Sequence, residues 1–198
     1  MNVFLIAVSL EDHSHNDCLL VTVMSHGEED GRIHAADKEY SVQKLWEVFL
    51  GDECKSLTGK PKLFFIDTSR GDLNDPGVKL NNASDEVEDD STENVYMIPK
   101  LADLLVMHST TEGHSAFISL SSKLSWFLES LQAELKADSQ DDFMRILTRL
   151  NNRVANINHT KDTEFYGTKQ MPIIVSMLTK TLHFTPKRKK FQSHTNVQ

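Results

Sequence analysis

The chain has 198 residues, of which 39% are hydrophobic and 25% charged, and these values are ordinary for one globular domain with a sizeable core. Its net charge of -8 argues against a general nucleic-acid surface, and two cysteines are too few for a disulfide framework. No apolar run approaches the about 18 residues that a membrane-spanning helix needs. We therefore expect a cytoplasmic protein without nucleic-acid or membrane partners.

The first half of the chain alternates apolar runs with polar loops. Residues 18–24 are rich in Leu and Val, which predicts a buried strand that leads into a loop containing His26. Residues 41–50 place apolar side chains at helical spacing and predict a helix. Residues 62–66 predict a second buried strand, which is followed by a loop containing Ser69.

The second half continues the alternation. Residues 101–107 predict a third strand, residues 125–136 and 141–154 predict helices, and residues 172–184 predict a final strand. Strands alternating with helices favour an α/β domain with a largely parallel sheet. In such sheets the reactive groups lie on loops beyond the carboxyl ends of the strands, so the two loops of the first half form the candidate site.

An acidic segment separates the two halves. Residues 81–96 hold six carboxylates and no basic residue, and they contain too little apolar surface to offset the entropy of ordering the segment. They predict a disordered linker between a larger part, 1–80, and a smaller part, 97–186. Residues 187–198 predict a basic disordered tail.

Three possible metal ligands, His13, His15 and Cys18, lie close together near the start. Since Cys18 belongs to a predicted strand and the histidines to a polar loop, we expect no metal site there. No other motif calls for a cofactor, and we expect none.

Two loop sequences point to a known family. One follows the first strand and the other follows the second: Ser25-His26-Gly27-Glu28-Glu29 and Asp67-Thr68-Ser69-Arg70-Gly71. The caspase signature is Gln-Ala-Cys-[Arg/Gln/Gly]-Gly with a histidine about 50 residues upstream. Here His26 precedes Ser69 by 43 positions. The chain resembles the caspase family of cysteine proteases, in its insect effector type, and further matches follow in order at residues 51–63, Ile98-Pro99, Ala102-Asp103, Ser109-Thr110, Ser125-Trp126-Phe127, 146–149 and 175–180.

The resemblance implies a caspase-like three-layer fold, in which a largely parallel sheet of about six strands lies between helices. It places the linker 81–96 where caspases are cut during activation, with possible cleavage after Asp89. It also implies that the last strand pairs across a twofold axis to form a dimer. The interface candidates are Ile173, Ile174, Val175, Met177, Leu178 and Leu182.

The resemblance also assigns the positions of an active site, and several of them differ from the family. Ser69 stands where caspases have the nucleophilic cysteine, whereas His26 and Gly27 match the catalytic histidine and an oxyanion-hole amide. Asp67 replaces a glutamine and Ile118 an arginine of the pocket for the substrate aspartate, and the second arginine of that pocket would precede this sequence. A carboxylate about 4 Å from the substrate's own would cost up to about 4 kcal/mol at an effective dielectric of about 20. Other positions of the former substrate pocket are His108, Phe117 and Trp126.

These differences lead to the prediction of a caspase-like pseudoenzyme, because a serine hydroxyl is a far weaker nucleophile than a thiolate and the pocket has the wrong charge. We expect no enzyme activity, and we expect the chain to regulate apoptotic proteolysis by pairing with an active effector-type caspase, as activator or decoy. Two alternatives stay open. Ser69 and His26 could form a working hydrolase with altered specificity, or the chain could act as a homodimeric scaffold.

Overall fold

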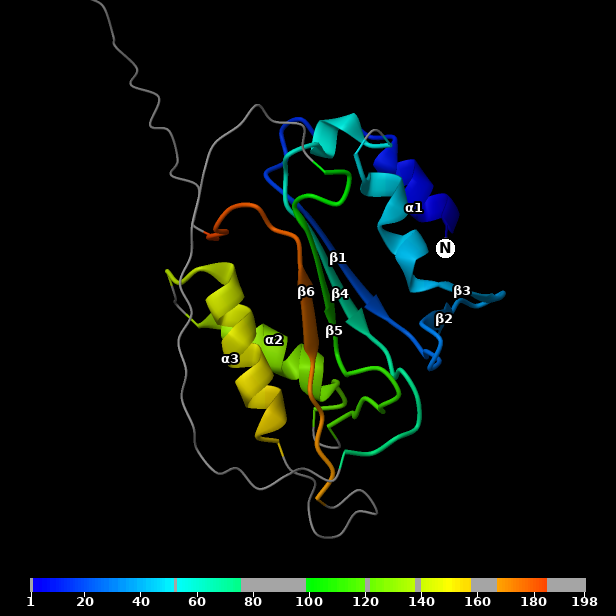
Figure 1. Ribbon diagram of the computed structural model, residues 1–198, viewed down its shortest axis with the longest axis vertical. Coiled ribbons are helices and arrows are strands. Elements are labelled where there is room, and N and C mark those ends of the chain that lie inside the picture. Colours follow the sequence, from blue (N-terminus) through cyan, green and yellow to red (C-terminus); the bar gives the residue numbers. More distant parts are fainter. Residues whose placement is uncertain are drawn as a thin grey trace, which may run out of the picture.

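A sheet of four strands forms the middle of the molecule. The structure is a computed structural model that describes residues 2–51, 53–75, 99–119, 122–137, 140–157 and 167–184. Its strands are β1 (Leu19–Met24), β2 (Arg32–His34), β3 (Glu39–Ser41), β4 (Lys62–Asp67), β5 (Leu104–His108) and β6 (Ile173–Ser176). The sheet has the order β1-β4-β5-β6, with β1, β4 and β5 parallel and β6 antiparallel to β5, while β2 and β3 form a separate ribbon (Figure 1). The expected α/β class with a mostly parallel sheet is confirmed.

The burial of the inner strand β4 explains why residues 63–66 are all apolar. All six of its residues are buried. Leu63 and Phe65 face one layer of the molecule, and Phe64 and Ile66 face the other. Side chains alternate between the two faces of a strand, so a strand covered on both faces is apolar along its middle, and here the two charged residues, Lys62 and Asp67, stand at its ends.

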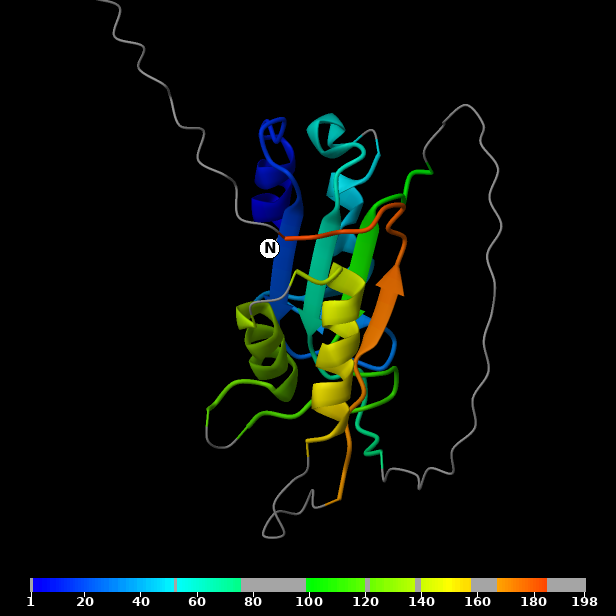
Figure 2. The same cartoon turned by 90° about the vertical axis from the view of Figure 1, so that its left-hand side faces the viewer.

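Two helices cover one face of the sheet. They are α2 (Trp126–Lys136) and α3 (Phe143–Ala155), close to the predicted bounds. Each begins at a capping residue whose side-chain oxygen accepts a hydrogen bond from an amide of the first turn, Ser125 at 3.0 Å and Asp142 at 2.9 Å. Figure 2 views the molecule from this side and shows both helices lying over the strands.

The opposite face is covered by one helix and short 3-10 turns: α1 (Asn2–Ser9), η1 (Val42–Leu45), η2 (Glu47–Phe49) and η3 (Lys55–Leu57). The predicted helix over 41–50 is thus two 3-10 turns that meet at Trp46, which ends the first turn and begins the second. Leu45 and Phe49 are still buried, and the Trp46 ring lies 5.8 Å from that of Phe64. Packing against the sheet, rather than helical propensity, determines this segment.

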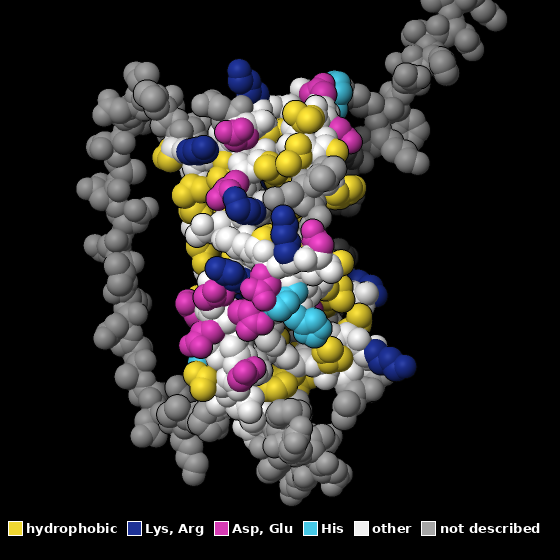
Figure 3. All heavy atoms as spheres, turned by 90° about the vertical axis from the view of Figure 1, so that its right-hand side faces the viewer, with side chains coloured by type: hydrophobic (Ala, Val, Ile, Leu, Met, Phe, Trp, Pro, Cys, Tyr) yellow, Lys and Arg dark blue, Asp and Glu magenta, His cyan; other side chains and the backbone are white. Residues whose placement is uncertain are grey.

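The surface over α1 and the β2–β3 ribbon carries acidic, basic and histidine side chains side by side (Figure 3). Several are ion-paired across the ribbon and its preceding turn. Arg32 contacts Asp30 at 3.0 Å and Glu39 at 3.6 Å, and His34 contacts Glu28 at 2.7 Å. Figure 3 shows acidic side chains gathered on this face, with basic and histidine side chains next to them.

Strand β6 is shorter than the predicted strand over 172–184. It ends at Ser176 because the chain then turns across the end of β5, where the Met177 amide donates to the Leu104 carbonyl. The Asp103 carboxylate next holds Thr179 by two hydrogen bonds, of 3.1 Å from its amide and 2.7 Å from its hydroxyl.

This early turn divides the predicted interface residues into two groups. Ile173 and Val175 lie on β6 at the edge of the sheet and are 36% and 45% exposed. The others pack against the chain's own core: Ile174, Met177, Leu178 and Leu182.

The predicted linker 81–96, its candidate cleavage position Asp89 and the tail 187–198 all lie outside the described residues. The division into parts 1–80 and 97–186 stays a prediction.

Candidate functional site

The two candidate loops meet at the carboxyl ends of β1 and β4. These strands pair in register up to Met24 opposite Asp67, and the Ser25 amide donates to the Asp67 carbonyl at 3.2 Å. Beyond this point the backbone of Gly27 lies so close to Ser69 that a Cβ on Gly27 would overlap the Ser69 carbonyl oxygen. Glycine is therefore required if the two loops are to meet.

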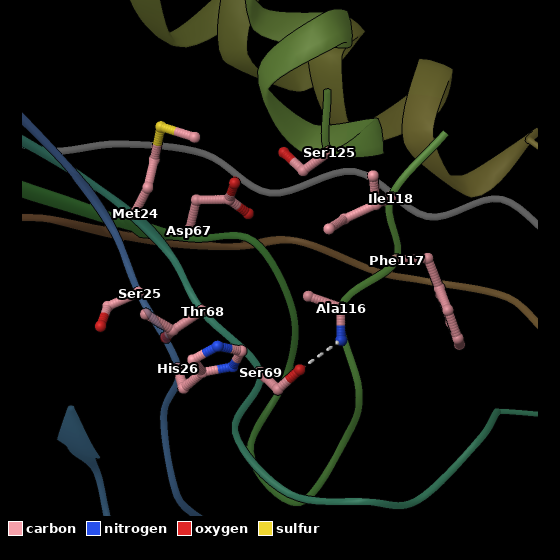
Figure 4. A pocket seen from close by; sticks show the side chains of 10 residues that line it. All are labelled: Met24, Ser25, His26, Asp67, Thr68, Ser69, Ala116, Phe117, Ile118 and Ser125. Carbon is pink, nitrogen blue, oxygen red and sulfur yellow. Dashed lines mark hydrogen bonds between the residues drawn. The ribbon is translucent and has the colours of Figure 1, made fainter. Parts of the chain in front are cut away.

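The loops open into a pocket of about 360 Å³. Figure 4 shows His26 and Ser69 together at one end of it. The described residues that line the pocket are Met24, Ser25, His26, Asp67, Thr68, Ser69, Ala116, Phe117, Ile118 and Ser125. The structure thus brings together His26, Ser69, Asp67, Phe117 and Ile118, which are five of the predicted site positions.

The hydroxyl group of Ser69 is held in place by the opposite wall of the pocket. Its Oγ accepts a hydrogen bond of 3.1 Å from the Ala116 amide. A hydroxyl that accepts one bond can still donate its proton, so this contact leaves Ser69 able to interact with a base. His26 lies beside it in the pocket and is the base that the arrangement offers.

Asp67 gives the pocket its charge. Its side chain is directed into the pocket, and the residue is 8% exposed. Burial raises the pKa of the Asp67 carboxyl above its usual value, although hydrogen bonds from the Ser125 and Ser109 side chains oppose this shift. No lysine or arginine occurs among the described lining residues, so nothing there would attract an acidic side chain.

The wall formed by residues 116–118 depends on a residue that sequence reasoning missed. The side chain of Gln170, which is buried, accepts a 2.9 Å hydrogen bond from the Phe117 amide and donates one of 2.7 Å to the Ser109 carbonyl. The one feature of the sequence that could have pointed to Gln170 is its position just before the apolar run of the last strand. Ile118, at the outer end of this wall, is 65% exposed.

A second pair of close backbone segments supports the loop after Ser69. Gly71 has φ 141° and lies against Gly113, whose φ is 80°, and a Cβ on Gly71 would overlap the Gly113 backbone. The Gly113 amide donates to the Arg70 carbonyl at 2.8 Å. The two loops are therefore joined directly through their main chains.

The structure places the remaining predicted positions outside this pocket. His108 lines a separate cavity of about 520 Å³ on the other side of the sheet, together with Arg70, Val175 and Met177. Burial, followed by the nearby charge of Arg70, lowers the pKa of His108 to about 4. Trp126 packs its ring 5.3 Å from that of Phe117, behind the pocket wall.

The described residues show neither a metal site nor a membrane span. They contain no group of three or more His, Cys, Asp or Glu side chains arranged to hold a metal ion. None of their helices has both the length and the apolar character needed to cross a membrane.

Comparison with known proteins gives consistent results. A family model described as the caspase domain matches residues 2–183. Caspase drICE of Drosophila melanogaster is 41% identical over 182 residues, and caspase-3 of Felis catus is 42% identical over 181. Each alignment covers 90% of this chain, but only 53% of the former protein and 63% of the latter, so the chain spans between half and two thirds of these relatives.

A solved structure agrees with the fold. The crystal structure of caspase-1 from Spodoptera frugiperda matches with a TM-score of 0.81 at 37% identity, over 98% of this chain and 71% of that chain.

These findings correct one prediction made from the sequence. The expectation that the chain is no enzyme is wrong, because the matched family is a peptidase family and the similar proteins are named as caspases. That expectation rested on Ser69, Asp67 and Ile118, which differ from the family at the nucleophile and in the substrate pocket.

Proposed function

The chain belongs to the caspase family, and from this premise we propose that it takes part in apoptotic proteolysis by pairing with an effector-type caspase protomer along the edge of β6. The observation that carries the proposal is this exposed edge. β6 pairs with β5 on one side, and among the described strands none pairs with its other side. A cytoplasmic location, expected from the sequence, remains a prediction.

The edge has the chemistry of a pairing strand. Ile173 and Val175 are exposed on it, and Met171 and Leu101 add exposed apolar surface nearby. An uncovered edge strand offers unpaired N–H and C=O groups to another strand, and proteins usually protect such edges with charges. This strand, Ile173–Ser176, contains no charged residue, which supports its burial in an assembly.

The test mixes the chain with an effector-type caspase and measures mass by analytical ultracentrifugation and peptide hydrolysis by fluorescence. We expect a mixed species and a changed hydrolysis rate. Val175→Lys should abolish both, because a charge would be buried at the edge. The matched control is Leu135→Lys on α2, since Leu135 is 46% exposed and Val175 45%. A chain that pairs only with itself, or that leaves the caspase unchanged, contradicts the proposal.

A second function is favoured by the pocket itself. Ser69 and His26 share it, and the Ala116 amide fixes the Ser69 hydroxyl. We propose that Ser69 attacks a bound ester or peptide carbonyl while His26 takes its proton, which the leaving group later receives.

A fluorophosphonate probe tests this second function without a known substrate. Attack by the Ser69 oxygen on phosphorus would expel fluoride and leave a covalent label. We expect labelling of the folded chain, loss of the label in Ser69→Ala, and no loss in Ser122→Ala, which removes an exposed hydroxyl outside the pocket. An unlabelled Ser69 in folded protein would rule this function out.

A further inference from the structure

We propose that the pocket beside Ser69 receives a basic side chain, that of lysine or arginine, with its cationic group at Asp67. This proposal rests on the second function, attack by Ser69 on a bound ester or peptide, in one respect: it takes the pocket to be the place where a peptide side chain enters. At about 360 Å³ the pocket lies at the lower end of the range for ligand sites, about 300–1,000 Å³.

The arrangement of the pocket suits a long side chain with a charged end. Figure 4 shows the Asp67 carboxylate between Met24 and Ser125, at the end away from Ser69. The walls between the two ends include the apolar side chains of Met24, Phe117 and Ile118. Lysine and arginine have apolar stems that pack on such walls while the cationic end contacts a polar group.

The charge of the pocket distinguishes a basic from an acidic occupant. Asp67 is the one carboxylate among the described residues that line it, and those residues include no lysine or arginine. The closest basic residue in the sequence, Arg70, lines two cavities other than this pocket and pairs with Glu112 at 3.5 Å. An acidic side chain would therefore meet a like charge, whereas a basic one would form an ion pair of low exposure.

The existing partners of Asp67 leave room for this pair. Ser125 and Ser109 provide hydrogen bonds to its carboxylate. A carboxylate has two oxygens and about four acceptor positions, so two hydroxyl groups do not exhaust it. Burial raises the pKa of Asp67, which means that desolvation penalises its ionised form, and a bound cation would relieve that penalty.

The experiment measures binding to the whole chain by NMR titration, with N-acetyl-lysine N-methylamide as the probe and N-acetyl-aspartate N-methylamide as its acidic counterpart. Signals of Ile118 and His26 report on the pocket. We expect the lysine probe to shift both signals to saturation and to bind at least about tenfold more tightly than the aspartate probe. Equal binding of the two probes, or no binding of the lysine probe, overturns the proposal.

Variants locate the effect. Asp67→Asn should weaken lysine binding by at least about tenfold and remove the preference over aspartate. Asp67→Gln serves the same purpose if the first variant does not fold. The matched control, Asp30→Asn, removes an exposed carboxylate outside the pocket and should leave both affinities unchanged. Unchanged lysine binding in a folded Asp67 variant also overturns the proposal.

This readout needs neither turnover nor pairing. Ser69→Ala should therefore keep the lysine preference even though it loses the fluorophosphonate label. If Ser69 is not labelled, the lysine titration can still show binding at Asp67. If lysine does not bind, Ser69 can still be labelled.

Discussion

At the scale of single residues, Gly27 holds the two halves of the site together. Gly27→Ala would place a Cβ against the Ser69 carbonyl, so we expect the loops to separate, the unfolding free energy to fall by about 1–3 kcal/mol, and probe labelling of Ser69 to be lost. Chemical denaturation and labelling measure the two effects.

The control for this change is Gly59→Ala. Gly59 has φ 70° but no heavy atom within 4 Å of an added Cβ. It should cost about 1 kcal/mol through backbone strain alone and keep the label. Equal labelling in both variants would contradict the role given to Gly27.

His108 should make the stability of the chain depend on pH. Its folded pKa of about 4 is below the ordinary value of 6.5, so the unfolded chain binds a proton that the folded chain does not. The contribution of neutral His108 to the unfolding free energy is therefore fully present above pH 6.5. It is lost as the pH falls toward 4, by up to about 3 kcal/mol. Its buried Nδ1 has no hydrogen-bond partner among the described residues, so a proton there would be unpaired.

Denaturation of the wild type and His108→Phe between pH 7 and pH 4 measures this effect. The variant should lose less stability across that range, since phenylalanine does not titrate. Identical pH profiles for the two proteins would mean that His108 makes no such contribution.

Whether a predicted site residue reaches the pocket depends on the face of the sheet on which it lies. His26 and Ser69 follow parallel strands, so their meeting was predictable. Asp67 lies on the same face of β4 as Phe65, toward α2, whereas His108 lies on the opposite face, with Val106. A shift of one residue in a predicted strand reverses the face, so the sequence could not separate these two positions.

At the scale of elements, Gln170 links the end of β5 to the wall of the pocket. Gln170→Leu would remove the two buried hydrogen bonds to the Phe117 amide and the Ser109 carbonyl, so we expect a loss of about 2–4 kcal/mol in unfolding free energy. It should also weaken binding in the pocket, because the wall would move. Denaturation and the lysine titration measure the two changes.

Gln132→Leu is the matched control, because Gln132 is an exposed glutamine on α2. It should change the unfolding free energy by no more than about 0.5 kcal/mol. If both variants behave alike, the two hydrogen bonds of Gln170 do not support the wall.

The sequence predicted the elements that have strong hydrophobic periodicity or complete burial. It did not predict the elements whose conformation depends on packing against the sheet. The bounds of α2, α3 and β4 lie within two residues of the predictions. The segment 41–50 has helical spacing but forms two 3-10 turns, one on each side of Trp46, and both Leu45 and Phe49 are nevertheless buried. α1 was not predicted, since its sequence is apolar on all sides and shows no clear stripe.

At the scale of the whole molecule, stability should fall from the centre of the sheet toward its free edge. β4 is buried on both faces, whereas β6 is the edge strand and is largely exposed. Hydrogen–deuterium exchange should therefore be slowest in β4 and faster in β6.

A caspase partner should slow exchange in β6 without altering β4. Mass spectrometry of the mixture measures this, with the Val175→Lys variant as the comparison. If exchange slows on another surface and stays unchanged in β6, the partner binds that other surface and the proposed interface is wrong.

The contact between Gly71 and Gly113 has a practical consequence for anyone who wishes to retarget the pocket. Both glycines adopt backbone angles that other residues rarely accept, and a Cβ on Gly71 would in addition overlap the Gly113 backbone. Randomised libraries should therefore leave these two sites fixed and vary Met24 and Ile118, whose side chains are exposed and line the opening. Diversity placed at the glycines would mostly yield misfolded clones.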